Sequence, residues 1–481
     1  MRRSRWTVLC AASAAALLAG CGVLVPKLPP EKSGIPVEWP LPPTTGAGLE
    51  GAASPSIDTT LASGHAVADI GWRDFFVDPD LETLIGLALA NNRDLRVAVL
   101  NVERARAQYR IQRAARVPSI AASGTLTRSG GETLPVTEAV GVAAGVVDFE
   151  FDLFGRVRNL SQAQLQRYFA QEEARRAAQL SLIAEVANAW LTLGADRELQ
   201  RVARETLGNR EQALVLTKKR HDLGAVSELD VAQAETSVET ARADLARYSG
   251  LVATDINALT LLAGAPIDPA LLAAKVDPEV SGLGALPAGL PSEVLLRRPD
   301  IRQAERLLRA ANANIGAARA AFFPSISLTG SVGYASDELS GVFDSGNRVW
   351  SFAPRVTLPL FTGGRNIANL KSATADRDIA LAQYEKAIQA GFRDVADALA
   401  LTHTLAEQKA SQMALLAAAT RADELSRVRY ESGRDSYLVL LDSQRTLYGA
   451  QQALIAVQLA EQSNRIRLYQ VLGGGWNENT R

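Results

Sequence analysis

Acidic side chains at alternate positions are the first feature of this sequence that could carry chemistry. Asp148, Glu150 and Asp152 occupy every second residue of the stretch Val147–Leu153. Paired carboxylates can act as general acid and general base, or can hold a hard cation. In a β-strand, however, side chains two residues apart point to the same face. The simpler interpretation is therefore one water-exposed strand face, with Val147, Phe149, Phe151 and Leu153 on the other face.

Residues that commonly serve enzymes and metal centres are scarce. The chain has 481 residues, a formal net charge of −1, three histidines and two cysteines. Both cysteines, Cys10 and Cys21, lie at the amino terminus, so the rest of the chain can form neither a disulfide nor a cysteine metal cluster. The sequence contains no GxSxG motif, no phosphate loop and no dinucleotide fingerprint. We expect no enzymatic activity, no cofactor, no metal and no nucleic-acid partner.

The amino terminus predicts export and lipidation. Arginines precede an apolar run that ends near Leu18, which indicates a secretory signal over residues 1–20. The following Leu-Ala-Gly-Cys resembles the bacterial lipoprotein box, in which Cys21 would be lipidated and become the first residue. An ordinary cleavage site with a chance cysteine is the alternative. Gly22, in place of the aspartate that commonly retains lipoproteins in the inner membrane, favours the outer membrane. A lipid anchor alone binds reversibly, so stable attachment needs a second signal.

Pro324 separates two periodicities. Residues 299–320 have the spacing of a helix, whereas from Ile326 to Tyr334 bulky apolar residues mostly alternate with Ser, Thr and Gly. That alternation predicts a strand with two different environments. Proline suits the junction because it disfavours helical geometry in the preceding residue and donates no hydrogen bond. With its return strand, the stretch predicts a β-hairpin over about 324–360.

The same junction occurs 206 residues earlier, at Pro118, and predicts a first hairpin over about 118–153. Other matches follow in the same order. LFGRVRN at 153–159 matches LFTGGRN at 360–366, and Arg220, Gly224, Ser227 and Leu229 match Arg429, Gly433, Ser436 and Leu438. Matches in one order at nearly constant spacing indicate an internal duplication.

The duplication sets the predicted organisation of the chain. The expected parts are a signal peptide at 1–20, a lipid-anchored extended segment at 21–70, a first repeat at 71–264, a linker at 265–290, a second repeat at 291–474 and a loose tail at 475–481. Asp78 is placed to cap a helix that runs from Pro79 toward Val117.

Each hairpin is followed by a long tract without proline, at about 156–223 and 363–432. As helices these tracts would each span on the order of 100 Å. Gly224 and Gly433 then predict tight reversals into returning helices. No mature segment has about 18 uninterrupted apolar residues, so no transmembrane helix is expected.

An exported chain with four alternating strands suggests a contribution to a transmembrane β-barrel. Open sheet edges cannot face lipid, and four strands are too few to close a barrel. The chain would therefore have to form oligomers. Two ordinary hairpins packed on the helices are the alternative that periodicity leaves open.

Several motifs together resemble the outer membrane efflux proteins. They are the lipoprotein box, ARAAFFPSISL, LPLFTGGRN, LLRRPDI at Leu295–Ile301 and YESGRDSYLVLLDSQRTLYGAQQ. More narrowly, they resemble the lipoprotein branch of OprM and NodT, with TolC more distant. The resemblance implies an α+β fold. Three chains would form a trimeric outer membrane β-barrel, with four strands per chain and twelve in total, continued by a long α-helical barrel in the periplasm.

The resemblance also implies a function. The homotrimer would be a passive, gated exit duct for drugs or other toxic small molecules, anchored by lipid in the outer membrane and extending into the periplasm. Its partners would be a periplasmic adaptor and an inner-membrane transporter of the resistance-nodulation-division type. A duct for type I protein secretion and a structural coiled-coil envelope lipoprotein are the alternatives.

The family closes its periplasmic end at the tips of the helical hairpins. There the resemblance implies that Asp442 is a constriction or latch residue. The further gate candidates are Tyr430, Arg434, Asp435, Tyr437 and Arg445, and the candidate adaptor contacts are Gly224, Gly433 and Arg220. Val439 departs from the paired acidic residues of TolC-like members, so a double acidic ring is not expected. Alternatively, Asp442 and Arg445 form a surface pair worth a few tenths of a kcal/mol, and the glycines are simply turns.

Overall fold

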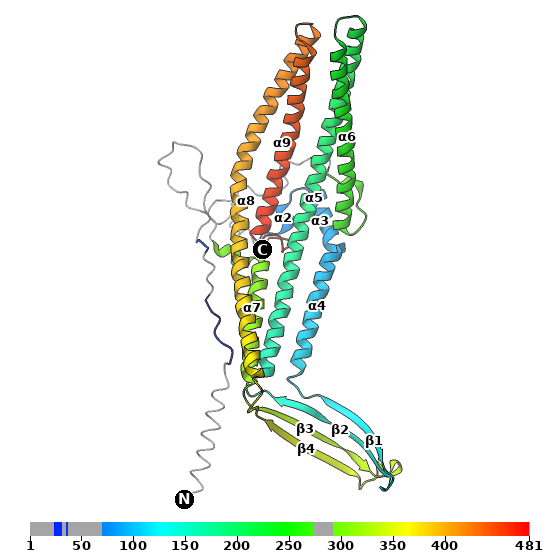
Figure 1. Cartoon of the computed structure of the whole chain (residues 1–481), viewed down its shortest axis with the longest axis vertical. Coiled ribbons are helices and arrows are strands. Elements are labelled where there is room, and N and C mark those ends of the chain that lie inside the picture. The colour runs from blue at the N-terminus through cyan, green and yellow to red at the C-terminus, as the bar shows by residue number, and fades with distance from the viewer. Residues whose placement is uncertain (1–23, 31–34, 37–69, 274, 276–291, 481) are drawn as a thin grey trace. The chain divides into compact units, whose positions relative to one another are not determined.

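The computed structural model describes residues 24–30, 35–36, 70–273, 275 and 292–480, and Figure 1 shows their helices and strands. The chain divides into two compact units. The first comprises Met1–Ser33, Leu100–Glu173 and Arg302–Ala387, and the second comprises Gly34–Val99, Ala174–Ile301 and Ile388–Arg481. We describe each unit by itself.

The same order of elements occurs twice along the chain. In the first half, α2 (Trp72–Phe75) and α3 (Pro79–Asn91) precede α4 (Arg93–Ala114), β1 (Ile120–Ser129), β2 (Thr137–Phe151), α5 (Arg156–Asp222) and α6 (Glu228–Ala263). In the second half, the order is α7 (Pro299–Ala320), β3 (Ser325–Ser336), β4 (Arg348–Thr357), α8 (Arg365–Glu431) and α9 (Tyr437–Val471). Short 3₁₀ turns lie at Pro269–Leu271, Ser292–Arg297 and Leu339–Gly341. None of the helices in the described ranges is long and apolar enough to cross a membrane.

The first unit contains a four-stranded antiparallel sheet in the order β1-β2-β3-β4 (Figure 1). Both predicted hairpins are present: β1 begins two residues after Pro118, and β3 begins directly after Pro324. Among the described residues, the outer strands β1 and β4 each pair with a single neighbour. The sheet therefore has two open edges.

The strand register separates an apolar face from a small polar face. On the apolar face, Val332 pairs with Trp350 in β4 and with Ala144 in β2. On the other face, the hydroxyl groups of Ser331 and Ser351 lie 2.8 Å apart and form a hydrogen bond. Trp350 is 77% exposed in the single chain. An exposed apolar face backed by a hydroxyl-lined face fits a sheet with lipid on one side and water on the other.

The predicted alternation of β2 is wrong at Val147. Val146 pairs with Gly330, but the next paired residue is Phe149, opposite Leu328. This bulge takes up one extra residue, and its Asp148 has a positive φ of 47°. The apolar face therefore continues from Val146 to Phe149, and Val147 lies outside the regular alternation.

The carboxylates that could have formed a reactive cluster have structural partners instead. Glu150 forms an ion pair with Arg156 at the start of α5. The two oxygens of Asp152 accept hydrogen bonds from the backbone N–H groups of Val157 (3.0 Å) and Arg158 (2.6 Å). Asp152 thus caps the first turn of α5, where backbone donors have no partners within the helix.

The helix predicted from Pro79 toward Val117 is in fact two helices. Asp78 caps α3 as expected, since its carboxylate accepts hydrogen bonds from the first turn. The chain then breaks at Asn92, which has an extended ψ of 132°. The Asn92 side chain accepts from Leu95 N (2.9 Å) and donates to the Leu262 carbonyl (2.9 Å). Asn92 therefore starts α4 while it binds the end of α6.

The tail predicted to be loose is bound to α2, which the sequence did not predict. The N–H groups of Trp72 and Arg73 donate to the carbonyls of Asn477 and Glu478, at 3.1 and 3.2 Å. The Asp74 carboxylate accepts from both the N–H and the hydroxyl group of Thr480, each at 2.6 Å. These bonds fix the carboxy-terminal segment as part of the second unit.

An aromatic contact holds this α2–tail region to α9. The rings of Phe75 and Tyr469 stack with centroids 3.8 Å apart, and the Tyr469 hydroxyl group donates to the Ile70 carbonyl at 2.7 Å. All three side chains are buried. Helix α2, the tail and α9 therefore form one packed region.

We predict that Phe75→Ala opens this region. Loss of a buried phenylalanine costs about 3–5 kcal/mol, so amide hydrogen exchange at Trp72–Phe76 should become about 100-fold faster or more. Val77→Ala is the matched control because Val77 is exposed, and it should leave exchange unchanged. Equal exchange in the two variants would contradict the packing described.

Candidate functional site

The two hairpin tips of the second unit are built by the same turn. Helix α5 turns into α6 at Gly224, and α8 turns into α9 at Gly433. Both glycines have a φ of +71°, a conformation that costs a residue with a side chain strain energy. In each turn, the residue after the glycine donates its N–H to the carbonyl five residues earlier. The bonds are Ala225 N to Arg220 O (2.8 Å) and Arg434 N to Arg429 O (2.9 Å). The turns have the pattern of a Schellman motif.

Asp435, a predicted gate residue, is engaged within its own hairpin. Its two oxygens accept from Arg429 Nε at 2.6 Å and from a terminal nitrogen of the same guanidinium at 2.8 Å. This hydrogen bonding lowers the pKa of Asp435 and raises that of Arg429. Asp435 therefore stiffens the α8–α9 turn.

Tyr430 and Tyr437, also predicted gate residues, are buried within the single chain. They are 4% and 3% exposed, and their ring centroids lie 5.7 Å apart. The same cluster contains Leu440 and Leu441 of α9 and Ala234 of α6. Burial raises the pKa of the Tyr437 hydroxyl group. The two tyrosines thus join the α8–α9 hairpin to the α5–α6 hairpin.

Arg220 also links the α5–α6 hairpin to the α8–α9 hairpin. Its guanidinium carbon lies 4.5 Å from the centroid of the Tyr430 ring, within the range of a cation–π contact. Two of its nitrogens donate long hydrogen bonds of 3.4 Å to the carbonyls of Tyr430 and Glu431. Arg220, predicted to contact an adaptor, binds its own second hairpin.

A difference between the two repeats explains why Arg220 and Arg429 have different partners. They occupy equivalent positions of the two repeats, 209 residues apart. The position equivalent to Asp435 is Val226 in the first hairpin. Arg429 therefore has a carboxylate at this position of its turn, whereas Arg220 does not and reaches Tyr430 instead. Sequence reasoning named Arg220 but missed the role of Arg429, although the repeat offset pairs the two.

Three predicted gate residues are exposed: Arg434, Asp442 and Arg445. Within the described part of the chain, none of their charged groups forms an ion pair or a side-chain hydrogen bond. The surface pair between Asp442 and Arg445 that was considered as an alternative is therefore not formed. These three charges are available to groups outside the single chain.

Apolar side chains are exposed near the same tips. Leu223, next to Gly224, is 85% exposed, and Leu229 and Leu438 are more than half exposed. Exposed apolar residues that cluster at one end of a molecule commonly mark an interaction surface.

Comparison with known proteins shows which family the chain belongs to. The model of the outer membrane efflux protein family matches residues 84–265 and 290–474. This chain belongs to that family. It is 44% identical over 482 residues to the probable efflux pump outer membrane protein TtgC of Pseudomonas putida, which covers 98% of this chain and 96% of TtgC. It is 46% identical over 429 residues to the outer membrane protein OprJ of Pseudomonas aeruginosa, covering 86% of this chain and 88% of OprJ.

A solved structure agrees with this assignment. The open state of the Neisseria gonorrhoeae MtrE outer membrane channel matches with a TM-score of 0.84 and 40% identity, over 95% of this chain and 99% of that chain. As an outer membrane efflux protein, this chain is the exit duct of a tripartite pump. It forms a homotrimer in the outer membrane, extends into the periplasm and works with a periplasmic adaptor and an inner-membrane transporter.

A titratable pair lies elsewhere in the first hairpin of this efflux protein. The carboxyl groups of Asp196 in α5 and Asp255 in α6 interact, and each has a raised pKa with burial as the main cause. Burial raises the pKa of Asp196 to about 6, and the nearby carboxylate of Asp255 adds to the shift. The folded hairpin therefore retains a proton that an exposed aspartate releases near pH 4.

We predict that this pair makes the hairpin sensitive to pH. Because the pKa of Asp196 is raised by folding, its stabilising contribution is complete below about pH 4 and is lost as pH rises through about 6. Amide protection in the α5–α6 hairpin, corrected for intrinsic exchange, should fall between pH 5 and pH 7. Asp196→Asn should abolish this fall. Glu239→Gln, an exposed change on α6, should preserve it, and equal wild-type protection at both pH values would refute the prediction.

Proposed function

We propose that this duct exports small apolar or amphipathic toxic compounds delivered by a transporter of the resistance-nodulation-division type. Relatives from Pseudomonas putida are named as outer membrane proteins of antibiotic, toluene and solvent efflux pumps. The observation that carries the proposal is that one chain combines an amphipathic sheet with open edges and two long helical hairpins. This combination suits conduction through a membrane and across the periplasm.

The chain itself performs no catalysis in this proposal. Its relatives are channel proteins of efflux systems, not enzymes. The acidic residues at its turns and helix ends serve as caps and ion-pair partners, as Asp152 and Asp435 do. The duct is therefore passive, and the inner-membrane transporter supplies the energy.

Asp442 is the proposed constriction or latch residue of the periplasmic gate. It is exposed on α9, within a few turns of the tip, and so are Arg434 and Arg445. In a trimer, three copies of Asp442 would face a shared axis, where they repel one another and attract cations. Arginines of neighbouring copies would offset this repulsion and stabilise the closed state. Tyr430 and Tyr437 support the gate by holding the two hairpins of one chain together.

The turns at Gly224 and Gly433 are the proposed contacts with the adaptor. Leu223 beside the first turn and Leu438 after the second give these tips apolar character. Helical hairpin tips of an adaptor could pack end to end against such turns. Arg220 would act indirectly, because it fixes the position of one tip relative to the other.

Lipidation of Cys21 is the proposed anchor. Cys21 lies outside the described residues. The segment that follows it is bound to α7 in the first unit: Asn312 donates to the Pro26 carbonyl at 2.8 Å, and Arg319 donates to the Leu24 carbonyl at 3.1 Å. Since Leu24 is only three residues from Cys21, the lipidated cysteine would lie within about 11 Å of Leu24.

We predict that deletion of the gene increases the accumulation of a lipophilic fluorescent dye and slows its wash-out from energised cells. Complementation with the wild-type chain should restore both rates. The same deletion should leave the secreted protein profile unchanged. Unaltered dye kinetics together with loss of an exported protein would show that the duct exports proteins rather than small molecules.

We predict that replacing both Asp442 and Arg445 by Ala makes the closed duct leak. An exposed ion pair is worth up to about 1 kcal/mol, so each lost contact would raise the ratio of open to closed channels by up to about fivefold. Conductance in a planar bilayer measures this ratio. Asp397→Ala, an exposed change on α8, is the control, and wild-type conductance in the double variant would exclude the gating role.

A further inference from the structure

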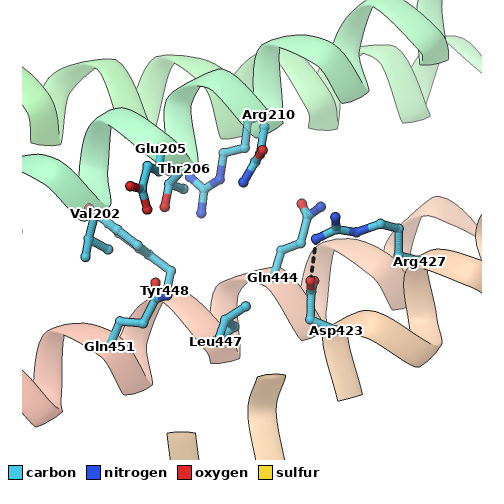
Figure 2. Close-up of a pocket in the computed structure, with 11 residues that line it drawn as sticks. Val202, Glu205, Thr206, Arg210, Asp423, Arg427, Gln444, Leu447, Tyr448 and Gln451 are labelled. Atoms are coloured by element: carbon cyan, nitrogen blue, oxygen red, sulfur yellow. Dashed lines mark hydrogen bonds and ion pairs between the residues drawn. The ribbon is translucent and has the colours of Figure 1, made fainter. Parts of the chain in front are cut away.

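A cavity of about 80 Å³ lies between α5 and the α8–α9 pair, entirely within the second unit (Figure 2). Figure 2 shows Arg210 extending from α5 into the space between the helices, while Asp423 and Arg427 face each other on α8. A site for one water-sized species needs only about 10–15 Å³ of such volume. The cavity therefore accommodates several small species.

Arg210 is the unusual group in this lining. It is only 5% exposed, and among the described residues no carboxylate forms an ion pair with it. One terminal nitrogen donates to the Ser237 carbonyl at 2.9 Å, and the guanidinium lies 5.4 Å from the centroid of the Tyr448 ring. Its Nε is itself buried and has no hydrogen-bond partner within the described part of the chain. Burial lowers the pKa of Arg210, as expected for a cation that has lost its water.

The other charged residues of the lining have ion-pair partners. Asp423, itself buried, forms an ion pair with Arg427 at 2.7 Å. Glu205 forms an ion pair with Arg201 at 2.6 Å, outside the cavity, and Arg201 also pairs with Glu198. Among the lining residues described, Arg210 is thus the buried charged group without an ion-pair partner. A lone buried charge is strongly unfavourable, and an opposite charge close by reduces that cost.

We propose that this cavity binds a small inorganic anion of about the size of chloride, with Arg210 as its main ligand. The guanidinium of Arg210 would donate to the anion. The Gln444 side chain reaches the same space from α9, where its amide nitrogen can donate as well. Unpartnered oxygens of Asp423 and Gln444 would accept hydrogen bonds from water molecules that accompany the anion.

Such an anion would connect the two hairpins of one chain. Arg210 belongs to α5, whereas Gln444 belongs to α9. The site is separate from the exposed residues proposed for the gate, and it does not depend on which compound the duct exports. It would make the contact between the hairpins depend on the anion in the medium.

Bromide, which replaces chloride and scatters anomalously, tests the site in crystals of the wild-type trimer. We expect an anomalous peak in each copy within about 3.5 Å of an Arg210 nitrogen. Arg210→Met should lose this peak. Arg204→Met, the same change at an exposed position of α5, should keep it. Ordered water without anomalous signal at Arg210 would overturn the proposal, and the wild-type crystal alone decides this.

A solution measurement gives an independent answer. Amide exchange near Arg210 should be slower in sodium chloride than in sodium methanesulfonate of the same ionic strength. The difference should vanish in Arg210→Met and persist in Arg204→Met. Equal exchange of the wild-type protein in the two salts would contradict anion binding.

Discussion

The two open edges of the β-sheet are the constraint on which the rest of this structure depends. Strands β1 and β4 each have one partner within the described chain. In lipid, every unpaired backbone N–H or C=O group costs several kcal/mol, so an edge must find another strand. Three copies satisfy all the edges at once by closing a barrel. The exposed Trp350 and the apolar row across Val332 and Ala144 then face lipid rather than water.

One turn design serves two purposes at the hairpin tips of the second unit. The Gly224 and Gly433 turns have the same conformation, but only the second hairpin has a carboxylate that engages its arginine. Val226 in the first hairpin leaves Arg220 available for Tyr430. Because of this single difference between the duplicated segments, one arginine forms an ion pair within its own hairpin and the other contacts the neighbouring hairpin. Such divergence lets two turns with the same backbone conformation make different contacts.

Features set by neighbouring residues could be predicted from the sequence, whereas features set by distant residues could not. Prolines at the strand junctions and glycines at the reversals act through local backbone geometry. The break at Asn92 depends on a carbonyl of α6, 170 residues away. The bulge at Asp148 depends on Thr329 of another strand, whose hydroxyl group accepts from Asp148 N at 3.2 Å. The burial of Tyr430, a predicted gate residue, likewise depends on side chains of a different hairpin.

Disulfide formation between β1 and β4 tests the closed trimeric barrel most directly. One cysteine would replace Ser351 of β4, and another would replace Ser123, Thr125 or Thr127 of β1 in turn. Within a chain these strands are three strand spacings apart, about 14 Å, which exceeds the reach of about 7 Å between bridged Cα atoms. A trimeric barrel predicts covalent dimers and trimers on a non-reducing gel for at least one pair. Monomers alone for every pair would contradict closure of the sheet by neighbouring copies.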